Sequence, residues 1–367
     1  MPQNSSFRIA VMPGDGIGTE IMAPCLEVLR RVQGRIGGFG LDFEELPAGA
    51  DHYRETGTAL PDDSLRRAGE ADAVLLGAMG LPSVRYPDGR EIAPQLDLRE
   101  TFELFAGLRP VRSLPGLPGP LADPRAEKLD FVLIRESTEG LFAARGKTVF
   151  DGDETARDTM VITRRACERL FQAAFDLARR RRAKGHPGRV TCIDKSNVLG
   201  SFAFFRKIFD ECAARNPDVE AAHCYVDAMA LTLIRNPWDL DVLVTENLFG
   251  DILSDAGAAL MGGMGMAPSA DVGASQAVFQ PCHGTAPDIV GTGKANPTAM
   301  YLSAAMMLDW LGEQHKLPSC VEAGNLLVRA VEQAFAGGGL RPTELGGGSG
   351  LREITDAVLT ALDGAAA

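Results

Sequence analysis

The sequence lacks paired cysteines and zinc-type histidine spacing. Its seven cysteines are scattered without a C-x-x-C pair, and its five histidines are not spaced as zinc ligands. Scattered, unpaired cysteines in a large chain are typical of reduced thiols in the cytoplasm. Any metal site in this chain should therefore hold a hard cation through oxygen ligands.

The sequence is also poor in basic charge and has no long apolar run. It has 37 Lys and Arg against 49 Asp and Glu, a net charge of −12, which argues against a nucleic-acid partner. No segment approaches the roughly 18 uncharged apolar residues of a membrane span. The opening "MPQNSSFRIAVMPGDG" has no signal-peptide pattern. We therefore expect a cytoplasmic protein with no membrane partner.

What the sequence does contain is a regular alternation of short apolar runs and longer helical segments. "FRIAVMPGDGIG" predicts a strand that ends in a glycine turn, and "TEIMAPCLEVLRRVQ" predicts the helix after it. This rhythm recurs along the 367 residues and predicts an α/β fold with mixed or parallel sheets. Residues 111–124, rich in Pro and Gly, predict a linker or exposed loop between units. The basic run 178–189 predicts the solvated end of an amphipathic helix.

Charged residues follow three successive strands. Lys195 follows "VTCID", Asp227 ends "HCYVD", and Asp251 and Asp255 follow "VLVTEN". Because ligands bind at the carboxyl ends of strands in open α/β sheets, these residues predict a divalent-cation site with a lysine for proton transfer. The alternative for the two aspartates is a favourable contact with the helix dipole, which suits Asp251 better than Asp255.

Arginines indicate the charge of the substrate. Arg99 and Arg109 lie in "LDLRETFELFAGLRPVR", and Arg135 lies in "LIRES". Taken alone, Arg99 fits an exposed helix position, whereas the other two lie at element ends. Guanidinium groups bind carboxylates bidentately, so arginines with a divalent cation predict a di- or tricarboxylate substrate. Residues 281–297, "PCHGTAPDIVGTGKANP", predict a long loop that is either plain surface or functional.

Together these segments resemble the β-decarboxylating dehydrogenases, which include isopropylmalate, isocitrate, homoisocitrate and tartrate dehydrogenases. The resemblance runs nearly end to end and rests on "MPGDGIGTEI", "LRETFELFAGLRPVR", "RESTEGLF", "DKSNVL", "YVDAMA", "TENLFGDILSD", "HGTAPDIVGTGKANP" and "SAAMML". It implies a two-domain, isopropylmalate-dehydrogenase-like α/β fold, not a Rossmann fold, with mixed sheets flanked by helices. Residues 1–104 and 262–367 would form a cofactor-binding terminal domain. Residues 105–261 would form a central domain with a dimerisation arm and part of the active site.

The resemblance also implies NAD, Mg²⁺ or Mn²⁺, and a homodimer whose active sites are shared between subunits. Lys195 and Asp227 would come from one subunit as catalytic residues. Asp251 and Asp255 of the other subunit would bind the metal together with Asp227. The residues implied to contact the dicarboxylate substrate are Arg99, Arg109, Arg135, Gln95, Leu96 and, from the other subunit, Val198. Those implied to contact the cofactor are His283, Gly284, Thr285, Ala286, Asp288, Ile289 and Asn296, with Asp288 favouring NAD over NADP.

Two positions depart from the family pattern. The family usually has Tyr, whose hydroxyl helps to protonate the product, where this chain has Phe142. It tends to have Glu where this chain has Gln280, a milder change. We expect oxidative decarboxylation of a malate-type 2-hydroxy dicarboxylate, with 3-isopropylmalate as the best named substrate. The alternatives are a tartrate, malate, homoisocitrate or isocitrate dehydrogenase, a non-catalytic regulatory subunit of such an enzyme, or a Mg²⁺-dependent phosphate-handling enzyme, for which no P-loop is found.

Overall fold

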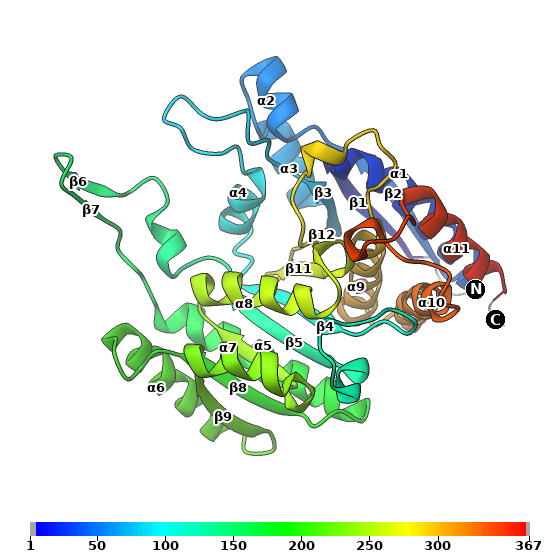
Figure 1. The fold of residues 1–367 in the computed structure, drawn as a ribbon. Helices are drawn as coiled ribbons and strands as arrows, with labels where there is room; N and C mark the ends of the chain where they lie inside the picture. Colours follow the sequence, from blue (N-terminus) through cyan, green and yellow to red (C-terminus); the bar gives the residue numbers. More distant parts are fainter. Residues whose placement is uncertain (1–4, 365–367) are drawn as a thin grey trace.

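A computed structural model describes residues 5–364, and one continuous sheet of ten strands organises this part of the chain (Figure 1). The strand order is β2-β1-β3-β12-β11-β4-β5-β10-β8-β9. β11 is antiparallel to both of its neighbours, and β4 is antiparallel to β5, whereas the other neighbouring pairs are parallel. The predicted α/β fold with a mixed sheet is confirmed.

The sheet strands are β1 Ser5–Gly14, β2 Phe39–Glu45, β3 Ala73–Ala78, β4 Ala106–Arg112, β5 Asp130–Glu136, β8 Arg189–Asp194, β9 Glu220–Tyr225, β10 Val242–Thr245, β11 Pro268–Val272 and β12 Ala277–Pro281. The α-helices are α1 Ile17–Ile36, α2 Ala50–Thr56, α3 Asp62–Glu70, α4 Pro94–Thr101, α5 Arg164–Ala183, α6 Gly200–Arg215, α7 Val226–Arg235, α8 Asn247–Leu260, α9 Thr298–Gln314, α10 Pro318–Ala336 and α11 Leu351–Gly364. Short 3₁₀ turns are η1 Pro124–Lys128, η2 Leu141–Ala144, η3 Pro237–Asp239, η4 Met264–Met266, η5 Pro287–Ile289 and η6 Thr343–Leu345.

Helices cover both faces of the sheet, and strand alternation shows which helix lies on which face. Val278 of β12 packs in a cluster with α3 and α4, whereas the next residue, Phe279, contacts Trp310 of α9. Further along the sheet, Leu133 of β5 belongs to the core cluster that includes α8, whereas Val132 packs with α5. The front face therefore carries α4 and α8, and the rear face carries α9 and α5.

The two halves of the sheet meet where β11 pairs with β4. Ala270, Asp271 and Val272 pair there with Leu108, Gly107 and Ala106. One large apolar cluster includes residues from both halves, among them Phe7 of β1 and Leu243 of β10. The sheet and its main core are therefore continuous, and the division into domains at residues 104 and 262 stays a prediction.

Two of the local predictions hold only in part. Residues 111–124 form a mostly exposed loop, but they do not link two units, because they leave β4 and lead through η1 to β5, its neighbour in the same half of the sheet. The basic run at the end of α5 is only partly solvated. Arg181 is buried there, because its guanidinium donates to Asp241 at 2.6 Å and to Asp130 at 2.9 Å.

A two-stranded hairpin projects from the body of the molecule (Figure 1). It consists of β6 Val149–Asp151 and β7 Thr155–Arg157, and its Val149 and Phe150 are exposed. Across residues 5–364, no helix combines the length and the apolarity needed to cross a bilayer.

Candidate functional site

The four charged residues that follow strands come from adjacent parallel strands. β10 pairs with β8, and β8 pairs with β9, so their carboxyl ends lie at one edge of the sheet. Lys195 directly follows β8, and Asp227 lies in the first turn of α7 after β9. Asp251 and Asp255 lie one helical turn apart on α8, which follows β10. The fold therefore places all four near strand ends, as the sequence predicts.

A polar pocket of about 250 Å³ opens on the front face between α4 and α8. Asp251 and Asp255 line it from α8, and Gln95, Leu96 and Arg99 line it from α4. Arg109 and Arg135 line it as well, so the pocket brings two carboxylates and three guanidinium groups together. Its further lining residues include Phe142, Ser254, Ser269, Gln280, His283 and Gly284.

Two of the three arginines of this pocket, Arg99 and Arg109, are held by Asp271, a fully buried residue of β11. Its carboxylate accepts from Arg99 Nε at 2.9 Å and from Arg109 Nη2 at 3.1 Å, and Gln280 Nε2 donates to it at 3.0 Å. Burial opposes ionisation of Asp271, but these arginines and Arg135 hold its pKa well below the usual value. The expectation that Arg99 is exposed is therefore wrong, because this ion pair buries it.

Asp271 was not predicted as a site residue from the sequence. Its carboxylate lies inside the apolar stretch "APSADVG", which suggests burial but identifies no partner. Burial and two neighbouring cations lower the pKa of Arg135 to about 10, with burial the larger cause. Arg99 and Arg109 share the single carboxylate of Asp271, so this part of the pocket keeps an excess of positive charge, which suits a substrate carboxylate.

Asp271→Asn should destabilise the fold by about 3 kcal/mol at pH 7, because it leaves buried arginines without their counterion. The Asp271 pKa is lowered on folding, so its stabilising effect is present above the ordinary pKa of 3.8 and is lost as the pH falls below that value. Urea unfolding at pH 7 measures the change. Asp63→Asn, in an exposed pair with Arg66, is the matched control and should cost less than about 1 kcal/mol. Equal losses in the two variants would contradict this role for Asp271.

The dipole alternative for Asp251 and Asp255 is weakened by the cap of α8. Glu246 already caps this helix, because its carboxylate accepts from the backbone N–H groups of Leu248 and Phe249. Asp251 forms an ion pair with Arg135, and burial together with the charge of Asp251 raises the pKa of Asp255. Two carboxylates one turn apart in a pocket are the oxygen donors that a divalent cation prefers, and the cation would favour the ionised form of both. These residues fit a Mg²⁺ or Mn²⁺ ion.

Gly250 allows Arg135 to pack beneath this helix. A Cβ atom at position 250 would lie 2.6 Å from Cγ of Arg135, so only glycine leaves room for the arginine. The sequence "LFGD" thus places a carboxylate of α8 directly beside a buried cation of β5.

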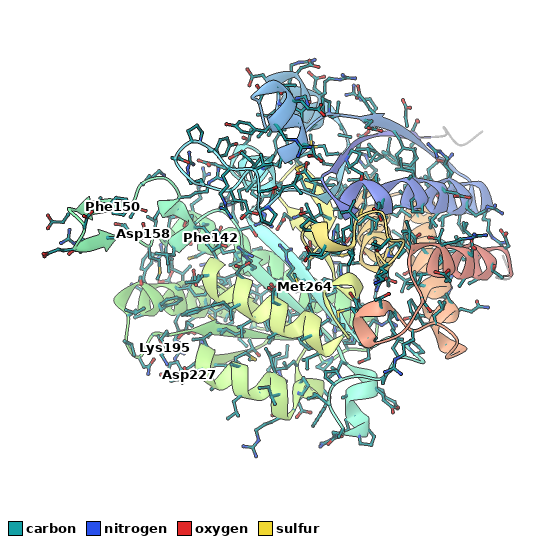
Figure 2. All side chains as sticks on the ribbon, turned by 45° about the horizontal axis from the view of Figure 1, so that its top comes forward. Phe142, Phe150, Asp158, Lys195, Asp227 and Met264 are labelled. Carbon is teal, nitrogen blue, oxygen red and sulfur yellow. The ribbon has the colours of Figure 1, made fainter. Side chains whose placement is uncertain are left out.

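Lys195 and Asp227 lie apart from this pocket. Lys195 Nζ donates to Asp227 Oδ1 at 2.5 Å, and this bond is the main cause of the lowered pKa of Asp227. Figure 2 shows both residues together at the lower edge of the molecule, away from Phe142. Within one chain these two residues do not join Asp251 and Asp255, because neither lines the pocket that holds them. A site completed by a second chain stays a prediction.

A different group of metal-type side chains lies near Lys195. Among the described residues, Cys192, Asp194 and His223 have ligand atoms close enough for one ion. However, Arg206 donates to both oxygens of Asp194, at 2.7 Å and 3.0 Å. Both oxygens of Asp194 are thus occupied, whereas Arg135 binds only Oδ1 of Asp251, and we assign no metal to the group.

The loop at 281–297 borders a second pocket of about 240 Å³. Its anchor is Thr285, whose carbonyl accepts from the N–H of Ile17 at 3.0 Å and whose hydroxyl donates to the carbonyl of Gly80 at 2.6 Å. The loop therefore packs on the glycine turn between β1 and α1. Of the predicted cofactor residues, His283, Ala286, Ile289 and Asn296 line this second pocket, and Gly284 lines the first.

His283 lines both pockets, so the two are adjacent. Its Nε2 is buried and has no hydrogen-bond partner among the described residues. Burial lowers the pKa of His283, which keeps the ring neutral near pH 7. An elongated dinucleotide that crosses from one pocket into the other would give this atom a partner, so the residues fit NAD.

Asp288 lies outside the lining of the second pocket. It is exposed in η5, whose neighbouring residue Ile289 does line the pocket. Six lining residues were not predicted from the sequence; five of them come from segments far from the 281–297 loop, and Lys294 lies within it. They are Ile17, Met264, Gly265, Lys294, Thr343 and Glu344.

The model of the family described as isocitrate/isopropylmalate dehydrogenase matches residues 8–358. The chain belongs to this family. It is 40% identical over 354 residues to the 3-isopropylmalate/3-methylmalate dehydrogenase of Methanocaldococcus jannaschii, covering 96% of this chain and 97% of that one. It is 36% identical over 362 residues to a probable tartrate dehydrogenase/decarboxylase of Bacillus subtilis, covering 97% and 98% of the two chains. The predicted family is confirmed.

The solved structure of isocitrate dehydrogenase from Methylococcus capsulatus matches with a TM-score of 0.84 at 33% identity, covering 97% of this chain and 99% of that one. The predicted fold is therefore confirmed as well. As a member of the isocitrate/isopropylmalate dehydrogenase family, the chain is an oxidoreductase, a β-decarboxylating dehydrogenase that acts on a CH–OH group. This membership argues against a phosphate-handling enzyme.

Proposed function

We propose that this protein oxidises and decarboxylates a malate-type 2-hydroxy dicarboxylate with NAD and Mg²⁺ or Mn²⁺. The observation that carries the proposal is the front pocket, which joins Arg99, Arg109 and Arg135 to Asp251 and Asp255. Several relatives named 3-isopropylmalate dehydrogenase support 3-isopropylmalate as the first substrate to test.

When bound, NAD accepts a hydride from the substrate, and the divalent cation stabilises negative charge on substrate oxygens. The arginines bind and orient the substrate carboxylates. Asp251 and Asp255, with Asp227 from a second chain, would hold the cation. As a neutral amine, Lys195 would receive the proton of the substrate hydroxyl at Nζ, and its contact with Asp227 orients it for this transfer.

Lys195 and Asp227 can serve this pocket only from a second copy of the chain, so we propose a homodimer with shared active sites. Exposed apolar side chains support such an interface. Leu231 and Ile234 of α7 and Ile252 of α8 are more than half exposed, at 54%, 67% and 61%. Val198, 67% exposed close to Lys195, would reach the substrate in the other subunit. The hairpin, in which Figure 2 labels Phe150 and, just beyond its second strand, Asp158, extends from the body and would be the dimerisation arm.

Residues 1–104 with 262–367 would be the cofactor-binding domain, since the second pocket lies wholly within them. Residues 105–261 would be the central domain, which carries the hairpin, Lys195 and Asp227. We place the protein in the cytoplasm, where its seven cysteines stay reduced, as the free cysteines of the structure allow.

We expect NAD to be preferred over NADP. Asp288 is exposed and directly precedes Ile289, which lines the second pocket, and a carboxylate there would accept from a ribose 2′-hydroxyl but repel a 2′-phosphate. Asp288→Lys should reduce the NAD preference, measured as the ratio of kcat/KM values, by about tenfold or more, and Asp288→Asn should reduce it less. Equal kcat/KM values for the two cofactors in the unmodified protein would contradict this assignment.

Tartrate is the second candidate substrate, and Gln95 favours it. The amide oxygen of Gln95 is buried in the front pocket and has no hydrogen-bond donor among the described residues. A substrate hydroxyl would donate to this oxygen, whereas an isopropyl group would leave it unpaired, which is costly in a buried site. The relative named as a probable tartrate dehydrogenase/decarboxylase supports this candidate.

The direct test of the proposed function is NADH formation with 3-isopropylmalate, tartrate, malate and isocitrate, each with NAD and Mn²⁺. We expect one substrate to be clearly preferred and the activity to disappear with EDTA and return with Mn²⁺ or Mg²⁺. Binding of these acids without NADH formation would favour the non-catalytic regulatory subunit instead.

A further inference from the structure

A third cavity, the rear cavity, lies on the rear face of the sheet, behind the front pocket, which is the proposed substrate pocket. Its volume is about 370 Å³, within the range of about 300–1,000 Å³ that is usual for small-molecule sites. α5 and α9 form its two walls, and the sheet forms its floor. The floor and adjoining wall are apolar, with Phe105, Leu108, Pro110, Val132, Val272, Phe279, Met306 and Trp310.

This cavity and the substrate pocket share strands but not residues. Leu108 and Pro110 of β4 face the rear cavity, whereas Arg109 between them faces the substrate pocket. Phe279 and Gln280 of β12 divide in the same way. Since successive side chains of a strand point to opposite faces, only the sheet separates the two sites.

The two walls of the rear cavity carry opposite charges. α5 contributes Arg180, and Lys184 follows directly at its end, whereas α9 contributes Asp309 and Glu313. Asp176 also lines the α5 wall, but Arg179 and Gln172 already bind its carboxylate, at 2.9 Å and 3.0 Å. Arg181, the remaining cation of that wall, is held by Asp241 and Asp130.

Polar groups at this cavity are incompletely satisfied. Arg180 Nη1 and Glu313 Oε2 form one ion pair across it, at 3.2 Å. Within the described chain, Lys184 and Asp309 have no ion-pair partner, and the buried indole N–H of Trp310 has no acceptor. Burial raises the pKa of Glu313, so a further cation beside it would be favourable.

We propose that the rear cavity binds a small zwitterion with an apolar side chain, of the chemical class of an apolar α-amino acid. The carboxylate pairs with Arg180 and Lys184 on α5, and the ammonium group pairs with Glu313 and Asp309 on α9. The side chain lies on the apolar floor beside Trp310. A molecule that carries only a carboxylate or only an ammonium group can form ion pairs with only one of the two walls.

The fluorescence of Trp310 reports directly on binding in the rear cavity. The chain has two tryptophans, and the other, Trp238, lies against Arg125 and does not line the cavity. In a Trp238→Phe background, L-phenylalanine should change Trp310 fluorescence saturably. Phenylalaninamide, which lacks the carboxylate, and 3-phenylpropanoate, which lacks the ammonium group, should bind about tenfold more weakly or worse.

Arg180→Gln and Glu313→Gln should each raise the Kd for L-phenylalanine by about tenfold or more, and Arg180→Lys should recover most of the loss. Arg182→Gln is the matched control on α5, because Arg182 pairs with Asp218 and does not line the cavity. Its Kd should be unchanged. Malate with Mn²⁺, which belongs in the substrate pocket, should not compete.

Three results would overturn the proposal: no saturable change with any of the three probes, equal affinity for all three, or displacement of L-phenylalanine by malate. An equal loss in Arg180→Gln and Arg182→Gln would also contradict it, since it would show that the general charge of α5 is responsible. None of these fluorescence and Kd measurements depends on catalytic activity, so their failure can be distinguished from failure of the proposed function.

Discussion

Phe142→Tyr should accelerate product formation from a malate-type substrate by roughly 10²-fold or more, because a positioned general acid commonly contributes about 10²- to 10⁴-fold. Phe142 lines the substrate pocket, and its ring lies 5.0 Å from the guanidinium carbon of Arg135. A tyrosine at this position would add a hydroxyl beside the bound substrate, where the family pattern usually has one.

No tyrosine among the described residues replaces that hydroxyl in the pocket. Tyr86, the best substitute by its position in the sequence, lies in a neighbouring cavity with Arg90, Asp97 and Arg145. Hydride transfer precedes protonation of the product, so the unmodified protein should still form NADH. We therefore expect slow turnover, or release of a keto acid that has kept its β-carboxylate.

The measurement is CO2 released per NADH formed, together with kcat, for both proteins. The matched control is Phe105→Tyr, because Phe105 lines the rear cavity and not the substrate pocket, and this variant should leave both quantities unchanged. One CO2 per NADH with fast turnover in the unmodified protein, and no gain in Phe142→Tyr, would show that another group already supplies the proton.

Lys195→Met should lower kcat for NADH formation by roughly 10²- to 10⁴-fold, because it removes the group that receives the hydroxyl proton. The fold should survive, because the partner of Lys195 is the exposed carboxylate of Asp227, and such pairs contribute about 0–1 kcal/mol. Thermal unfolding of the variant checks this point. Lys128→Met, at an exposed position in η1, is the matched control and should retain full activity. A Lys195→Met protein with unchanged kcat would remove Lys195 from the mechanism.

The fold class was predictable because strand and helix patterns are local. Each apolar run that ends in a turn, such as residues 73–80, becomes a strand of the sheet. The long helices α1 and α5 follow from apolar periodicity over 20 residues each. The loop at 281–297 was likewise predictable, because Gly and Pro exclude a regular helix there.

The site was only partly predictable, because its partners are distant in sequence. Asp271 binds Arg99 across 172 residues, and no local pattern predicts that contact. The same holds for Arg181 of α5, whose burial depends on Asp241, the residue before β10. The separation of Lys195 from Asp251 is also invisible in the sequence, since both residues follow strands that are neighbours in the sheet.

The proposed function depends most on active sites that two chains share. Mixed dimers of two inactive variants test such sharing directly. Lys195→Met and Asp251→Asn chains with different tags are co-expressed, and the mixed dimer is purified through both tags. One of its two sites then has every residue intact, so the mixed dimer should recover about half of the kcat of the unmodified dimer, whereas each parent stays inactive. The mixed dimer of Lys195→Met with Asp227→Asn should remain inactive, because both changes fall on the same side of the interface and damage both sites. An inactive dimer of Lys195→Met with Asp251→Asn, or an active dimer of Lys195→Met with Asp227→Asn, would contradict the shared site.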